Sequence, residues 1–182
     1  MKKIIGVILL ITCTFLITGC GCTMNDANPE EAVETFFEKY RAKDDNVLTQ
    51  LRQTIESEIL NDDNKVKYEE LMEKQYDSLS YVIKDTSVNN NESAECIVEV
   101  TVLDYKGAID TADAELKENP DRFNDEDGKF SDDKFMAYKI ELMEKVTDTI
   151  THTINLNLTK DAGMWKVDEL SKDDIKKLHG IY

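Results

Sequence analysis

The residues best suited to acid–base chemistry in this sequence are its two histidines, His152 and His179. A histidine titrates near neutral pH, so it could serve as a general base if an acid oriented its ring. His152 shares one face of a predicted strand with apolar residues, whereas His179 follows a short predicted helix whose last carbonyls it can contact. No acid stands at a patterned spacing from His152. A buried or half-buried histidine with one hydrogen bond is the favoured interpretation, and no catalytic residue is predicted.

The acidic segment at residues 121–133 raises the question of calcium binding. Gly128 can be aligned with the sixth position of an EF-hand loop, which puts Asp125 and Asp127 at the third and fifth. The first position is then Phe123 and the twelfth is Lys134, so the first ligand and the bidentate glutamate are both missing. A solvated acidic loop is therefore predicted, with no metal site. The sequence also lacks a glycine-rich phosphate loop, and no cofactor is predicted.

The N-terminal residues have the composition of an export signal. Lys2 and Lys3 precede an apolar run at residues 4–17, and small residues and a cysteine follow it. The run has about 14 residues, fewer than the roughly 20 that a membrane-spanning helix needs. The segment resembles a bacterial lipoprotein signal, whose lipobox ends in Gly-Cys. This resemblance implies cleavage between Gly19 and Cys20 and a diacylglycerol group on the Cys20 sulfur.

Two other cysteines, Cys22 and Cys96, have different expected roles. Cys22 is a second possible lipid acceptor, but the position three residues before it is not aliphatic, whereas Ile17 fills that position for Cys20. Cys96 lies in a predicted strand, where a small buried apolar residue is favoured over a disulfide with Cys22. The cysteine spacing does not fit a zinc site.

The lipoprotein interpretation divides the chain into a signal peptide at residues 1–19, a lipidated tether at residues 20–28 and one domain at residues 29–182. Removing the signal takes away two lysines and changes the formal net charge from -16 to -18. Such acidity argues against nucleic acid as a partner. The predicted location is the extracytoplasmic face of the cell membrane, where diacylglycerol on Cys20 would anchor the chain to the lipid bilayer.

Hydrophobic periodicity predicts the secondary structure of the domain. Helical spacing begins near residue 28 and recurs at residues 45–60, 65–78, 106–118 and 134–146, with a polar break at residues 61–64. Strand-like alternation occupies residues 79–88, 95–105, 148–160 and 164–170, and Ser171 caps a last short helix. In the helix at residues 134–146, the predicted inner side carries Phe135, Tyr138, Leu142 and Val146. The order predicts an α+β fold, with N-terminal helices packed on an antiparallel sheet of about four strands and a helical insert between the second and third strands.

Two segments give this domain a family resemblance. The opening Pro-Glu-Glu-Ala-Val-Glu-Thr-Phe-Phe of residues 29–37 and the terminal Gly-Met-Trp-Lys-Val-Asp of residues 163–168 are similar to the nuclear transport factor 2-like superfamily, also called cystatin-like or SnoaL-like. Many Gram-positive lipoproteins of unknown function look like this. The resemblance implies a curved, cone-shaped sheet. Enzymes of the superfamily use Asp, His and Tyr side chains inside the cone.

The predicted function is a non-catalytic domain that binds a small ligand or a protein. A cone-shaped sheet covered by helices favours an apolar cavity, and its expected lining is Tyr81, Val98, Val100, His152, Ile154 and Trp165. One alternative is a homodimerisation or protein-interaction module that uses the exposed sheet face of Thr151, Thr153, Asn155 and Asn157. A further alternative is a small-molecule enzyme centred on His152.

Overall fold

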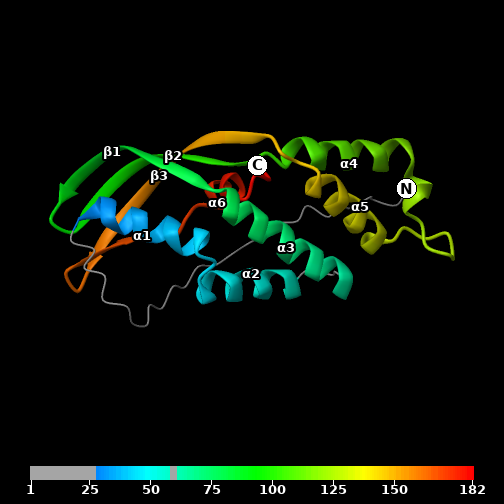
Figure 1. The fold of residues 1–182 in the computed structure, drawn as a ribbon, viewed down its shortest axis with the longest axis horizontal. Coiled ribbons are helices and arrows are strands. Elements are labelled where there is room, and N and C mark those ends of the chain that lie inside the picture. Colours follow the sequence, from blue (N-terminus) through cyan, green and yellow to red (C-terminus); the bar gives the residue numbers. More distant parts are fainter. Residues whose placement is uncertain (1–27, 58–60) are drawn as a thin grey trace, which may run out of the picture.

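The computed structural model describes residues 28–57 and 61–182. The elements in these residues are α1 (Pro29–Arg41), α2 (Asp45–Ser57), α3 (Asp62–Ser78), β1 (Ser80–Asn90), β2 (Ser93–Leu103), α4 (Lys106–Glu118), the 3₁₀ helix η1 (Pro120–Phe123), α5 (Asp132–Glu144), β3 (Thr149–Asp161), β4 (Met164–Val167) and α6 (Lys172–Leu178). Three helices precede a four-stranded antiparallel sheet, and α4 and α5 lie between its second and third strands (Figure 1). The predicted α+β class is confirmed.

Helix α1 begins where its sequence signals predict. The Asn28 side chain accepts a hydrogen bond from the Glu31 N–H at 2.9 Å, and Pro29 occupies the first turn. The buried side of the helix carries Ala32, Val33, Phe36, Phe37 and Tyr40. The Phe37 ring stacks on Tyr81 of β1 with the ring centres 4.6 Å apart. Helix α1 therefore packs its aromatic side against the inner face of the sheet.

Helix α3 starts at Asp62, three residues before the predicted start at residue 65. Its cap is Asn61, whose side chain accepts a hydrogen bond from the Asn64 N–H at 2.9 Å. The Asn64 side chain is itself buried and donates to the Asp133 carbonyl at 2.9 Å. The polar residues that end the preceding helical pattern thus form a capped helix start, which also joins the N-termini of α3 and α5.

The four strands pair in the order β1–β2–β3–β4, and every pair is antiparallel. Burial alternates along β2, whose inward side chains are Ala94, Cys96, Val98, Val100 and Val102. On β3 the predicted outer row of Thr151, Thr153, Asn155 and Asn157 is exposed. Ala162 and Gly163 form the two-residue turn to β4 with φ values of 51° and 90°, the left-handed region that tight hairpin turns require.

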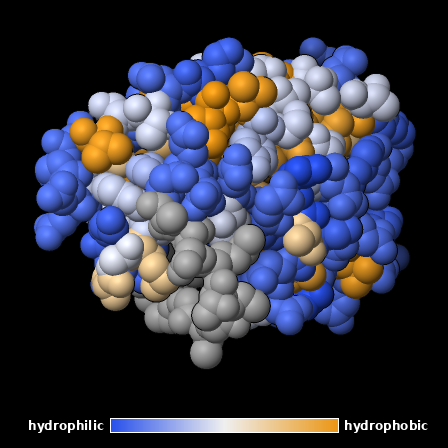
Figure 2. Space-filling view, turned by 60° about the vertical axis from the view of Figure 1, so that its left-hand side comes forward, coloured by the Kyte–Doolittle hydropathy of each residue, from blue (hydrophilic) through white to orange (hydrophobic). Residues whose placement is uncertain are grey.

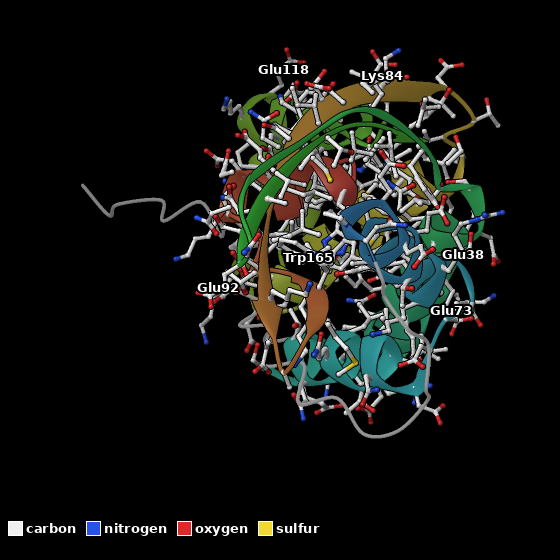
Figure 3. All side chains as sticks on the ribbon, turned by 90° about the vertical axis from the view of Figure 1, so that its left-hand side faces the viewer. Glu38, Glu73, Lys84, Glu92, Glu118 and Trp165 are labelled. Carbon is white, nitrogen blue, oxygen red and sulfur yellow. The ribbon has the colours of Figure 1, made fainter. Side chains whose placement is uncertain are left out.

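The main hydrophobic core lies between the inner face of the sheet and the helices. Figure 3 shows the sheet arching over the interior, with Trp165 beneath the arch and the labelled Lys84, Glu38 and Glu73 at the periphery. Buried side chains from α1, α2, α3, β2, β3, β4, α5 and α6 form this core, and partly buried residues of β1 and α4 pack against it. Cys96 is buried there as a free thiol, as predicted.

Helices α4 and α5 form an arm that extends beyond the sheet (Figure 1). The arm has a small hydrophobic cluster of its own, formed by Ala112, Phe123 and Phe135 with Leu116, Tyr138 and Leu142 packed around it. The predicted inner side of α5 is therefore incomplete. One side of α5 packs in the cluster of the arm through Phe135, Tyr138 and Leu142. The other side packs in the main core through Met136, Ile140 and Met143. The acidic segment is also more ordered than predicted, since it contains η1 and a β-bridge between Asn124 and Phe130.

Candidate functional site

The predicted cavity residues lie together on the inner face of the sheet. Val98, Val100 and Ile154 are at most 1% exposed, and Trp165 is 5% exposed. All four belong to the main core, where the aromatic side of α1 packs against the sheet. Tyr81 is half-buried beside Phe37. These side chains have the packing of core residues, and their role in lining a cavity stays a prediction.

In the folded chain, His152 lies beside Tyr182. Its ring meets the Tyr182 ring edge to face, with the ring centres 4.5 Å apart. The Tyr182 hydroxyl donates to the Asp104 carboxylate at 3.3 Å, so the fold assembles a histidine, a tyrosine and an acid that the sequence did not connect. Among the described residues, however, the buried Nε2 atom of His152 has no hydrogen-bond partner. Burial and the nearby Lys177 lower the His152 pKa, against an opposing effect of Asp104.

The second histidine, His179, is part of a buried polar junction between α3 and the end of α6. His179 is 2% exposed, and its Nε2 atom lies 3.3 Å from the Tyr76 hydroxyl. Burial lowers the His179 pKa to about 4. The ring is therefore neutral at physiological pH. His179 is the C-cap residue of α6, but its backbone N–H makes the bonds to the helix carbonyls, whereas the ring, predicted to contact these carbonyls, lies beside Tyr76.

The same junction joins the end of β2 to α3 and to the C-terminus. The Gln75 side chain accepts a hydrogen bond from the Leu103 N–H at 2.9 Å and donates to the Leu103 carbonyl at 3.1 Å. Two residues after Leu103, Tyr105 donates its N–H to the Gly180 carbonyl at 3.0 Å. Gly180 itself has φ 68° and lies against the Leu103 carbonyl. These bonds satisfy backbone groups where β2 ends, so the junction has a structural role.

The helical arm carries a surface groove. Its volume is about 350 Å³, and α3, η1 and α5 form its walls. The lining residues are Lys67, Arg122, Phe123, Lys134, Ala137, Tyr138, Ile140, Glu141 and Glu144. None of the six predicted cavity residues is among them. The groove thus combines an aromatic and aliphatic floor with both signs of charge.

Contacts within the groove hold its cations in place. The Arg122 guanidinium lies 4.3 Å from the centre of the Tyr138 ring and donates to Glu115 at 2.8 Å. The hydrogen bond to Glu115 is the main reason why the pKa of Arg122 is raised. Lys134 donates to the Asn124 carbonyl at 2.7 Å, and Lys145 lowers the pKa of Glu141 by a hydrogen bond. The groove therefore presents apolar and charged side chains next to each other.

Sequence reasoning missed this groove because its walls come from three separate elements. A usable signal was present in α5, where Lys134, Tyr138 and Glu141 recur at helical spacing. Arg122 carried no such signal, since it stands in a segment dominated by acids. Its position over Tyr138 depends on the turn made by η1.

The acidic loop uses its carboxylates for its own backbone. The Asp125 side chain accepts hydrogen bonds from the N–H groups of Asp127 and Lys129, at 2.9 and 2.8 Å. In residues 28–57 and 61–182, His, Cys, Asp and Glu side chains form no group of three that could hold a metal ion.

Figure 2 shows a largely hydrophilic surface on which hydrophobic residues form separate small patches.

The predicted lipid acceptor Cys20 and the signal peptide lie outside the described residues. Among the helices that are described, none is both long enough and apolar enough to cross a membrane.

Comparison of the chain with protein-family models, with curated proteins and with solved structures found no match in any of the three.

Proposed function

We propose that this protein is a membrane-anchored extracytoplasmic lipoprotein whose α+β domain binds a ligand or a protein without catalysis. The observation that carries the anchor is the charged, then apolar, N-terminal sequence that ends in Gly19-Cys20. Diacylglycerol, with or without a further acyl chain, supplies the two or more chains that stable anchoring needs. The α+β architecture agrees with the nuclear transport factor 2-like resemblance, which remains part of the proposal.

Replacing Cys20 by serine is expected to abolish lipid attachment and to move the protein out of the membrane fraction. The reason is that the Cys20 sulfur would be the only atom that receives diacylglycerol. The measurement is metabolic labelling with an alkyne fatty acid in a bacterial host, followed by fractionation and mass spectrometry of the N-terminal peptide. The matched control is Cys22→Ser, which should keep both label and membrane location. Equal labelling of the Cys20→Ser protein would contradict the proposal.

We place the binding function in the groove between α3, η1 and α5. The supporting observation is a depression of about 350 Å³ in which the Tyr138 ring lies among Lys67, Arg122 and Lys134 and the two acids Glu141 and Glu144. Cations gathered in this way are unusual in a chain with 38 acids and 22 basic residues. Together with Glu141 and Glu144, they favour a ligand that carries polar or charged groups next to an apolar part.

A Tyr138→Ala substitution is expected to remove a small molecule that the wild-type protein retains during purification. Loss of the ring removes both apolar contact and the surface on which Arg122 rests. The measurement is native mass spectrometry of the full-length chain released from membranes by mild detergent, with circular dichroism to check folding. Tyr81→Ala is the matched control on the inner face of the sheet. If the bound mass is lost from the Tyr81 variant and kept by the Tyr138 variant, the ligand lies inside the sheet and the groove assignment fails.

A second candidate function is self-association or protein interaction through the outer sheet face. The observation that favours it is the exposed row of Thr151, Thr153, Asn155 and Asn157, which is uncharged in a highly charged protein. The Thr151 hydroxyl lies 2.7 Å from that of Thr101 on β2. The cross-strand hydroxyl pair gives this face an ordered polar surface.

A further inference from the structure

The first half of β3 has an open edge. Strand β3 pairs with β2 from Thr149 to Thr159, but its pairing with β4 covers only Leu158 to Asp161. The last backbone hydrogen bond on the β4 side joins the Asp168 N–H to the Asn157 carbonyl at 2.8 Å. Within the described part of the chain, residues 149–155 therefore have a strand on one side only. Both Figure 1 and Figure 3 show this half of β3 along the outer margin of the sheet.

The hydrogen bond that the Asn157 carbonyl accepts from Asp168 also shows which backbone groups of β3 point toward its unpaired edge. In an antiparallel strand, the N–H and C=O of one residue point the same way, and the direction alternates from residue to residue. Because the Asn157 carbonyl points away from β2, the backbone groups of Thr149, Thr151, Thr153 and Asn155 point away as well. These four residues present a regular ladder of donors and acceptors to the outside.

This edge lacks the features that usually prevent strands from pairing. Proteins protect exposed edges with bulges, charges or prolines. Strand β1, the other edge of the sheet, has two register shifts and carries Lys84 and Asp85. Strand β3 keeps an unbroken register with β2 and contains no charged residue from Thr149 to Thr159. In a chain that is 33% charged, a stretch of this length would contain roughly three or four charges.

The open segment of β3 is complementary to a second copy of itself, because it is free of charged residues from Thr149 to Thr159. Two copies with a net charge of -16 repel each other, so they can approach only where carboxylates are absent. Antiparallel pairing about a two-fold axis at His152 uses the whole free segment and places Thr151 opposite Thr153 of the other copy. Asp148 then lies opposite Leu156, not opposite another carboxylate. Threonine pairs of this kind stabilise adjacent strands, as Thr101 and Thr151 do within the sheet.

We propose that two copies of this protein pair through residues 149–155 of β3 and form one continuous eight-stranded sheet. The contact is edge to edge, so it differs from an association of outer sheet faces. It depends on the folded domain alone and is independent of the lipid anchor.

The first test is cysteine crosslinking of the full-length chain in membranes. Two tagged chains, one with Thr151→Cys and one with Thr153→Cys, are expressed together in a Cys22→Ser background and treated with a mild oxidant. Residues in such a pair lie about 5.5 Å apart between Cα atoms, within reach of a disulfide. The expected result is a crosslinked dimer of the two tags. The control is Ile97→Cys on the outer face of β2, where a face-to-face dimer would crosslink instead.

The second test is the mass of the detergent-extracted full-length chain as a function of concentration. Thr153→Pro removes one outward N–H and leaves the bonds to β2 in place, so it should weaken the dimer at least tenfold. Ile97→Lys should leave the dimer unchanged. A monomeric wild-type protein with no crosslink, or a dimer that survives Thr153→Pro but is lost with Ile97→Lys, would overturn the proposal. A heteromeric complex at this edge, in place of the dimer, would likewise reject the second copy as its occupant.

Discussion

Replacing Gly180 by alanine is expected to lower the free energy of unfolding by about 3 to 5 kcal/mol. Gly180 has φ 68°, and a Cβ atom there would collide with the Leu103 carbonyl oxygen and lie 2.8 Å from the Gln75 amide nitrogen. A left-handed conformation alone costs a non-glycine residue roughly 1–2 kcal/mol. Moving the C-terminus away would also break the bond from Tyr105 to Gly180 and disturb the Gln75 bridge.

The measurement is urea unfolding of the soluble chain from Asn28 to Tyr182, which contains both hydrophobic clusters. Gly107 provides the matched control, because a Cβ added there meets nothing within 4 Å and its backbone is not left-handed. Gly107→Ala is expected to leave stability unchanged or raise it by up to about 1 kcal/mol, since alanine loses less entropy in a helix. Similar stabilities for the two variants would show that the Gly180 junction contributes little.

Acidification from pH 7 to pH 4 is expected to destabilise the protein by about 3 kcal/mol through His179 alone. Burial lowers the His179 pKa from 6.5 to about 4. Between these values the unfolded chain binds a proton that the folded chain does not bind. Protonation therefore favours unfolding, and the stabilising effect of the neutral ring is lost as the pH falls through this window.

The contribution of His179 can be separated from that of the many carboxylates by a His179→Gln variant. Glutamine can keep a hydrogen bond to Tyr76 but does not titrate. The free energy of unfolding of both proteins is measured at intervals between pH 4 and pH 8, at constant salt. The difference between them should change by about 3 kcal/mol across the range, with the wild-type protein losing more stability at low pH. Two parallel curves would mean that His179 is protonated in the folded state without cost.

Local patterns were sufficient to predict most of the fold. The helix start predicted near residue 28 and the alternation predicted at residues 95–105 and 148–160 depend on neighbouring residues, and the structure forms α1, β2 and β3 there. Helix α5 shows where such patterns fail. It contacts two hydrophobic clusters at once, so a single apolar stripe describes only the side that faces the arm.

The candidate sites depended on contacts between distant residues, which periodicity does not reveal. Arg122 and Tyr138 belong to different elements, and their stacking follows from the turn between α4 and α5. Gln75 and Leu103 form a reciprocal pair across 28 positions. The predicted inner residues such as Val98 and Ile154 were correctly placed on one sheet face, but the same apolar pattern cannot separate a core from a cavity lining.

The helical arm has a consequence for the speed of folding. The central strands β2 and β3 pair from Leu103 with Thr149, so 45 residues (104–148) must be looped out before the ladder closes. For a flexible chain, that closure costs about 3 kcal/mol of entropy. Helices α4 and α5 pack antiparallel on each other around a local cluster, so a helical hairpin that forms before the sheet would bring the two strand ends together. The arm thereby turns the most distant pairing of the sheet into an effectively local one, and formation of the hairpin would set the rate at which the sheet assembles.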